Sequence, residues 1–169
     1  MTPLAVPGDS EHLVVTDSDE HDEEGHIVED AETRIKMVEK RLLKKFPLLQ
    51  KEIEPPLLYG SKVPEIILIC WGSTYGVVRE CVDELSGEHN IAMLHFSEIW
   101  PFPLRDRFDY LSILERARLS ISIEHNATGQ FRRLLRTETG YLTTHSINRF
   151  DGRPFTVEEL IERLKALIK

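Results

Sequence analysis

The feature that most constrains the fold is a regular alternation of short apolar runs with segments of helical periodicity. Residues 66–70, 91–96 and 119–124 are runs of five or six mainly apolar residues, long enough for a buried strand and too short for a typical helix. A helix-like pattern follows each run. Strands that are apolar on both faces and alternate with amphipathic helices predict an α/β fold, with a mostly parallel sheet covered on both sides.

The remaining elements complete this pattern. Helices are expected after the three runs, near residues 77–85, 104–117 and 130–137, and a fourth strand is expected near 142–147. The piece LLYG, residues 57–60, follows two prolines and is short, which favours a strand at the edge of the sheet. A C-terminal helix should begin at Thr156, with Glu159 completing a capping box.

An acidic region precedes this domain. Residues 1–32 hold eleven of the 29 acids and none of the 21 lysines and arginines, so the net charge of -8 belongs to this leader. A helix should begin near Ala31, with Asp30 as its N-cap, and should end at Pro47. Its apolar residues, which we expect to pack along an apolar surface, are Ile35, Val38, Leu42 and Phe46.

Charge and apolar content exclude several classes of protein. The basic residues are interspersed with acids, which argues against a nucleic-acid partner. No apolar run reaches the roughly 20 residues of a membrane span, and the N-terminus does not resemble a secretory signal, so we expect a cytoplasmic protein. Cys70 and Cys81 are predicted to be buried, reduced thiols, and two cysteines cannot supply a four-cysteine cluster site.

Three loops should converge on one rim, because the carboxyl ends of parallel strands face the same edge of a sheet. These loops are WGSTYG, SEIWPFP and EHNATG. The residues that we expect to contact a ligand or a subunit there are Gly72, Ser73, Thr74, Tyr75, Gly76, Trp100, Phe102, Glu124, Asn126, Thr128, Gly129 and Gln130. We predict no catalytic residue and no metal site, since the acids of the leader do not follow the spacing of a calcium loop.

Each loop has a simpler interpretation, and for the aromatic residues of the WPFP run, Trp100 and Phe102, it is packing instead of a partner contact. The backbone N–H groups from Ser73 to Gly76 could bind an anion at a helix N-terminus, or Ser73 or Thr74 could merely cap that helix at a strand-to-helix corner. Glu124 and His125, with Asn126, could serve acid–base chemistry, but a polar contact for Glu124 is favoured because no nucleophile accompanies it.

Five motifs, taken in order, resemble a known family. They are EHDEEGHIVEDAETRIKMVEKR, WGSTYGVVRECVDEL, HFSEIWPFP, EHNATGQFRRLLRTETG and NRFDGRPF. The sequence resembles the C-terminal part of the alpha subunit of 2-oxoacid:ferredoxin oxidoreductases, including the 2-oxoglutarate and pyruvate enzymes. The resemblance implies a transketolase C-terminal-like domain: three layers, α/β/α, around a five-stranded, mostly parallel sheet with one antiparallel edge strand, for which LLYG is the candidate.

The resemblance also implies a division of the chain and a set of partners. Residues 1–32 would be the end of a pyrimidine-binding domain and a connector, residues 33–54 a linking helix, and residues 55–169 the transketolase C-terminal-like domain. The whole enzyme would use thiamine diphosphate, magnesium and an iron–sulfur cluster to convert a 2-oxoacid to acyl-CoA and reduce ferredoxin. Its other parts, the remaining alpha segment and the beta subunit, would be the partners in an oligomer, with coenzyme A as a candidate ligand of the rim.

The residues limit what can be carried over. The diphosphate-binding motif of such enzymes is GDG with an Asn roughly 30 residues later, and Asp151 with Gly152 leaves too little chain for it. We therefore expect this chain to hold no cofactor, to be inactive alone and to serve subunit assembly. Two alternatives remain: a free-standing small-molecule or anion-binding regulatory domain, and an interaction protein whose acidic leader docks on a basic partner. An exposed apolar patch would favour the enzyme subunit over the free-standing domain.

Overall fold

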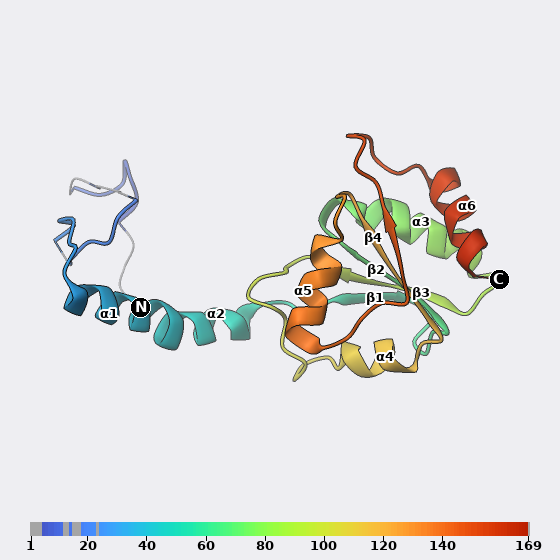
Figure 1. The fold of residues 1–169 in the computed structure, drawn as a ribbon, viewed down its shortest axis with the longest axis horizontal. Helices are drawn as coiled ribbons and strands as arrows, with labels where there is room; N and C mark the ends of the chain where they lie inside the picture. Colours follow the sequence, from blue (N-terminus) through green and yellow to red (C-terminus); the bar gives the residue numbers. More distant parts are fainter. Residues whose placement is uncertain (1–4, 12–13, 15–17, 23, 169) are drawn as a thin grey trace. The chain divides into compact units, whose positions relative to one another are not determined.

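The structure, a computed structural model, describes residues 5–11, 14, 18–22 and 24–168. The chain divides into two compact units, Met1–Leu49 and Gln50–Lys169, which we describe separately (Figure 1). The second unit holds the sheet.

Five strands form this sheet: β1 (Leu57–Gly60), β2 (Ile66–Trp71), β3 (Ile91–Phe96), β4 (Leu119–Glu124) and β5 (His145–Asn148). Their order in the sheet is β1-β3-β2-β4-β5. The edge strand β1 pairs with β3 in the antiparallel direction, and all other neighbouring strands are parallel. The predicted five-stranded sheet with an antiparallel edge strand at LLYG is therefore confirmed.

Helices cover both faces of the sheet, which gives the predicted three layers (Figure 1). The helices α3 (Tyr75–Leu85) and α6 (Val157–Leu167) lie on one face, and α4 (Tyr110–Arg116) and α5 (Gln130–Thr139) lie on the other. Successive side chains of β2 point to opposite faces, so Ile66 and Leu68 pack with α3 while Ile67 and Ile69 pack in the cluster that contains α4 and α5. The sheet thus buries apolar side chains on both sides.

Two elements of this unit begin later than predicted. The helix expected from residue 104 begins at Tyr110, because Asp109 caps it: the carboxylate accepts a hydrogen bond from the Ser112 N–H at 3.4 Å. The strand expected from residue 142 begins at His145. Just before it, the Thr144 side chain accepts from the Ser120 N–H at 2.9 Å and donates to the Ser120 carbonyl at 2.6 Å, replacing backbone pairing there.

The capping box predicted for the C-terminal helix is only half formed. The hydroxyl of Thr156 accepts a hydrogen bond from the Glu159 N–H at 3.2 Å, as expected. The Glu159 carboxylate, in contrast, pairs with Arg149 and with Arg163, which lies 2.7 Å away. A charged pairing on both oxygens replaces the reciprocal bond to the backbone.

In the first unit, the helix begins as predicted and continues beyond Pro47. The side chain of Asp30 accepts from the Thr33 N–H at 2.8 Å at the start of α1 (Ala31–Glu39). The predicted end at Pro47 is wrong, because a π-helical segment, η1 (Lys40–Lys45), leads into α2 (Phe46–Glu52). Pro47 is the second residue of α2, a position near a helix start where the missing N–H costs little.

The apolar side chains of this long helical region are not covered. Residues 31–52 include no buried side chain, and the exposed fraction is 60% for Ile35, 57% for Leu42 and 71% for Leu43. Leu48 and Leu49 are also more than half exposed. Within the first unit, the described residues leave Ile35 and Leu42 exposed and cover Val38 and Phe46 only in part. None of the described helices is both long enough and apolar enough to cross a membrane.

Candidate functional site

The strands β2 and β4 are neighbours whose following helices diverge. The chain leaves β2 for α3 on one face of the sheet and leaves β4 for α5 on the other face (Figure 1). Such a switch point opens a crevice beyond the carboxyl ends of the two strands, where α/β proteins bind ligands. A hollow of about 240 Å³ lies there, lined by Trp71, Ser73, Thr74, His125, Asn126 and Gln130.

The first wall of the crevice is a tightly bonded corner. After β2, Gly72 adopts a positive φ of 54°, and Gly72–Thr74 forms one turn of 3-10 helix before α3. The Thr74 hydroxyl donates to the Trp71 carbonyl at 2.7 Å and accepts from the Trp71 N–H at 3.3 Å. Thr74 therefore closes the turn. One interpretation of the sequence expected its side chain to cap α3, but no such cap is formed.

Two aromatic rings support this corner from beneath. The Tyr75 ring meets the His95 ring edge to face with 5.0 Å between centroids, and His95 Nε2 lies 3.1 Å from the Gly72 carbonyl oxygen. Ser73 and Gly76 are exposed. Of the corner residues, Ser73 and Thr74 line the crevice, whereas the Tyr75 side chain packs against the core.

The second wall is held by a buried carboxylate. Glu124, at the end of β4, is fully buried and accepts hydrogen bonds from the Phe131 N–H at 2.8 Å and the Arg132 N–H at 3.0 Å. It also accepts from the Asn126 side chain at 2.7 Å. These contacts fix the loop against the first turn of α5, where negative charge is favoured. Glu124 thus positions the loop and does not line the crevice.

The third loop contributes differently from the other two. Trp100 is 58% exposed, but Phe102 is only 5% exposed and belongs to an aromatic cluster with Phe96, Tyr110 and Phe131. Phe102 is therefore a core residue, a correction to its place among the expected contact residues. Burial wins because an aromatic ring held between stiff prolines can be directed inward as readily as outward.

The structure divides the residues predicted after β4 between two hollows. Asn126 and Gln130 line the crevice, whereas Thr128 and Gly129 line a second, larger hollow of about 410 Å³ beside α5. Gly129 has a φ of 63° and precedes the first residue of α5, so this turn uses a backbone conformation that favours glycine.

His125 stacks on a residue from a distant motif. Its ring lies 4.8 Å from that of Phe155, and its Nε2 accepts a hydrogen bond from the Phe155 N–H at 3.2 Å. His125 is an exposed residue, but partial desolvation of its ring, with the positive charge of Arg149, lowers its pKa. A neutral ring that already accepts a hydrogen bond at Nε2 is a positioning group for the crevice wall.

Three arginines beside the second hollow were not predicted as a site. Trp71 belongs to the expected rim loop WGSTYG, although it was not among the expected contact residues, and it lines the crevice. Arg132, Arg133 and Arg136 lie in the helix expected near residues 130–137, and only their RR–x–x–R spacing could have indicated a cluster.

Neither the two cysteines nor the Asp151 loop fits the cofactors that the family resemblance implies. Cys70 and Cys81 are both fully buried free cysteines, and burial raises the pKa of each thiol to about 12, which opposes the thiolate form that an iron–sulfur cluster needs. The Asp151 carboxylate accepts from the Arg149 guanidinium at 2.8 and 3.0 Å, and from the Arg153 N–H at 3.0 Å. The oxygens of Asp151 are therefore already bonded within their own loop and are not presented to a magnesium ion.

One group of possible cation ligands lies in the leader. Asp22, Glu24 and His26 have ligand atoms within 4.8 Å of one another. The Asp22 carboxylate, however, already accepts from the N–H groups of Glu24 and His26 at 3.0 and 2.8 Å. The group has the geometry of a short acidic turn, and nothing else among the described residues indicates a metal.

Fold and crevice define the class: a doubly wound α/β module with polar side chains gathered at its switch point. No model of a known protein family matches the chain. It is 34% identical over 154 residues to the alpha subunit of 2-oxoacid:ferredoxin oxidoreductase 1 from Sulfurisphaera tokodaii. It is also 35% identical over 155 residues to the alpha subunit of the corresponding enzyme from Saccharolobus solfataricus. Each match covers 89% of this chain and 24% of the relative.

A solved structure agrees with these matches. The 2-oxoglutarate:ferredoxin oxidoreductase from Magnetococcus marinus, determined with 2-oxoglutarate, coenzyme A and succinyl-CoA bound, superposes with a TM-score of 0.75 at 27% identity. The match covers 99% of this chain and 29% of that one. The predicted resemblance is confirmed: over 89% of its length the chain is a homologue of one part of 2-oxoacid:ferredoxin oxidoreductase alpha subunits.

Proposed function

We propose that this chain is the C-terminal part of the alpha subunit of a 2-oxoacid:ferredoxin oxidoreductase and that it works in subunit assembly. The complete enzyme would carry out thiamine-dependent oxidative decarboxylation of a 2-oxoacid to acyl-CoA, with reduction of ferredoxin, in the cytoplasm. The chain spans only 24% of the relatives' length, so this activity would need the other parts of the complex.

The observation that carries the assembly role is the uncovered helix of residues 31–52. Ile35, Leu42 and Leu43 are 60%, 57% and 71% exposed, and Leu48 and Leu49 exceed half. An apolar row of this kind on one helical region is unusual for a free-standing domain and typical of a surface that is buried in a complex. Its occupants would be the remaining alpha segment and the beta subunit.

This role suggests a division of labour along the chain. Residues 1–32 would be the end of the preceding pyrimidine-binding domain with its connector, residues 33–54 the linking helix, and residues 55–169 the docked domain. Thiamine diphosphate, magnesium and the iron–sulfur cluster would reside in the other parts, since the buried thiols and the bonded Asp151 loop do not suit them.

The crevice between β2 and β4 would face a neighbour in the complex. Ser73, Asn126 and Gln130 present polar groups along it. The Magnetococcus enzyme binds coenzyme A and succinyl-CoA, so this rim would border the route of coenzyme A or of the electron acceptor. Contact with a subunit and contact with a phosphate of the ligand are both compatible with its polar lining.

A second candidate function rests on the same crevice. A hollow of about 240 Å³ at a switch point is the usual ligand position of a free-standing α/β domain. In that case the chain would be a small-molecule or anion-binding regulatory domain, monomeric and stable without partners. The two functions differ in what purifies with the chain.

The test is affinity purification of the tagged chain from its native cells, followed by mass identification of the partners and a thiamine-dependent 2-oxoacid:ferredoxin assay. We expect the remaining alpha segment or a beta subunit to co-purify, with activity in that complex and none in the isolated chain. A clean monomer that binds nucleotide or coenzyme A, with no oxidoreductase partner, would contradict the proposal and support the regulatory domain.

A pair of variants tests the helix directly. Leu42→Gln with Leu43→Gln should abolish co-purification and leave the stability of the isolated chain unchanged, because both side chains are exposed in it. Val63→Gln is the matched control, since Val63 is 71% exposed but lies outside the helix. Equal loss of partners in the control would show that the helix is not the interface.

A further inference from the structure

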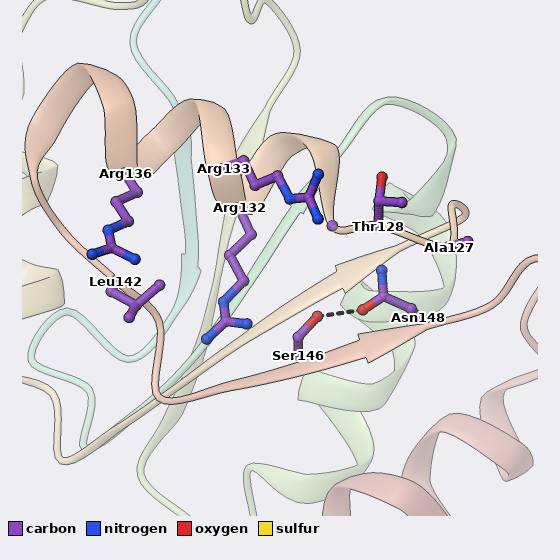
Figure 2. A pocket seen from close by; sticks show the side chains of 9 residues that line it. Ala127, Thr128, Arg132, Arg133, Arg136, Leu142, Ser146 and Asn148 are labelled. Atoms are coloured by element: carbon purple, nitrogen blue, oxygen red, sulfur yellow. Dashed lines mark hydrogen bonds between the residues drawn. The ribbon is translucent and has the colours of Figure 1, made fainter.

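The larger of the two hollows lies beside α5 and shares no lining residue with the crevice. Its volume is about 410 Å³, and Figure 2 shows the side chains that line it. Arg132, Arg133 and Arg136 extend from α5, Ser146 and Asn148 lie on β5, and Thr128 lies in the loop before the helix (Figure 2). The lining residues include three cationic side chains and no Asp or Glu. We call this hollow the arginine groove.

The charges of the arginine groove are not balanced by the protein. In the part of the chain that the structure describes, Arg133 and Arg136 form no ion pair and no side-chain hydrogen bond. Arg132 donates from Nη2 to the Thr143 carbonyl at 2.8 Å, but its Nε is buried and without a partner among the described atoms. A buried donor without an acceptor is costly, so the described residues leave Arg132 only partly satisfied.

The spacing of the arginines also favours a bound counter-charge. Arg132 and Arg136 are four residues apart on α5, and Arg133 and Arg136 are three apart, so like charges face one another on one side of the helix. Like charges at these spacings destabilise a helix when nothing lies between them. An anion in the groove would turn this repulsion into attraction.

Other arginines of the same domain show the contrast. Arg149 pairs with Asp151 and Glu159, and Arg163 pairs with Glu159 at 2.7 Å. Arg107 lies 3.6 Å from Glu54. The lining of the arginine groove, in contrast, offers its cations only uncharged neighbours, including Asn148, whose side-chain oxygen accepts from the Ser146 hydroxyl.

We infer that the arginine groove binds the phosphate groups of a small phosphorylated molecule. Guanidinium groups bind phosphate oxygens in pairs through parallel N–H donors, and three of them around one hollow suit a diphosphate or a phosphate ester. The groove runs along α5 from Thr128 and Gly129 to Arg136 in the last turn, and the helix dipole favours an anion only at its Thr128 end. This site is separate from the crevice, and the inference does not depend on the proposed function.

The residues have distinct roles in this site. Arg132 is bonded through Nη2 to the Thr143 carbonyl and is the fixed member of the cluster, which contributes its positive charge. Arg133 and Arg136 are exposed, and their guanidinium groups donate hydrogen bonds to the anion. Thr128 offers a hydroxyl at the end of the groove next to Gly129.

The experiment is a titration of the isotope-labelled full chain with inorganic pyrophosphate, followed by amide NMR shifts. We expect saturable shifts at residues 128–136 and a dissociation constant at least tenfold weaker in the Arg133→Gln, Arg136→Gln double variant. Arg79→Gln is the control, because Arg79 is exposed on α3, which covers the opposite face of the sheet from α5. ADP as a second probe should shift the same amides if a nucleotide is accepted.

Three results would overturn the inference. Shifts that grow linearly with concentration, or that sodium chloride reproduces at equal ionic strength, would mean charge screening and no site. Saturable shifts at Ser73 to Gly76 in place of α5 would assign the anion to the crevice. Displacement of pyrophosphate by a peptide of the acidic leader at lower concentration would make the groove a protein-binding surface.

Discussion

The carboxylate of Glu124 lies 2.8 Å from the Phe131 N–H and 3.0 Å from the Arg132 N–H, and it is completely buried. A residue at the end of β4 thereby anchors the first turn of α5. These two hydrogen bonds fix the position of one wall of the crevice relative to the start of the arginine groove.

We predict that Glu124→Gln lowers the free energy of unfolding by about 2 kcal/mol, because the amide offers one acceptor where the carboxylate offers two and buries an unsatisfied donor. Urea denaturation followed by circular dichroism measures this change. Glu162→Gln, an exposed position on α6, is the control and should change stability by less than about 0.5 kcal/mol. Equal midpoints for the two variants would mean that Glu124 does not anchor α5.

Gly129 carries the second prediction. Gly129 directly precedes α5 and has a φ of 63°. A β-branched residue is strained in this left-handed backbone region. Gly129→Val should lower the free energy of unfolding by about 2 kcal/mol, and Gly129→Asn should lower it less, because Asn tolerates left-handed backbone. Thermal and urea unfolding would measure both variants.

The control for this prediction is Gly87→Val. Gly87 does not have a positive φ, and an added Cβ there meets nothing within 4 Å. If Gly129→Val and Gly87→Val had the same stability and the same co-purifying partners, positive φ would not explain the glycine at residue 129.

The strands were the most predictable part of the fold. Residues 66–70, 91–96 and 119–124 form β2, β3 and β4 within one residue of the prediction, because a run that is apolar on both faces has few other places in a soluble domain. The prolines before LLYG correctly indicated an edge strand, β1. Two helix boundaries were predicted wrongly. The Asp109 side chain caps α4 and delays its start, and the π-helical segment before Pro47 leads into α2 where an end of the helix was expected.

The candidate site was predictable only to the level of loops. Convergence of WGSTYG and EHNATG follows from parallel strand order, and the structure brings Ser73, Asn126 and Gln130 together. The arginine groove was not predictable, since it needs β5 to lie in register with β4 so that Ser146 and Asn148 face α5. Whether Phe102 points inward depends on the packing of three other aromatic rings, which no local pattern encodes.

The buried thiols give a third prediction. Burial raises the pKa of Cys70 and of Cys81 to about 12, so neither is a thiolate near neutral pH. Ellman's reagent should leave both unmodified in the native chain and label both after addition of guanidinium chloride. Ser73→Cys, an exposed rim position, should label at once and serves as the positive control. Rapid labelling of two thiols in the native chain would contradict the packing around β2 and α3.

The last prediction concerns pH and the wall of the crevice. Burial and the charge of Arg149 lower the pKa of His125 in the folded chain below its unfolded value of about 6.5, with Asp151 opposing this shift. The unfolded chain therefore binds more protons in this range, so the contribution of His125 to stability is present above the unfolded pKa and is lost as the pH falls through the folded pKa. Protonation also removes the Nε2 acceptor for the Phe155 N–H.

Between about pH 7 and pH 5, the urea midpoint should fall more in the wild type than in His125→Gln, whose side chain keeps an oxygen acceptor and does not titrate. Parallel midpoint curves for the two proteins would show that His125 is not coupled to folding, and an NMR titration of its ring protons would then place its pKa at or above the unfolded value.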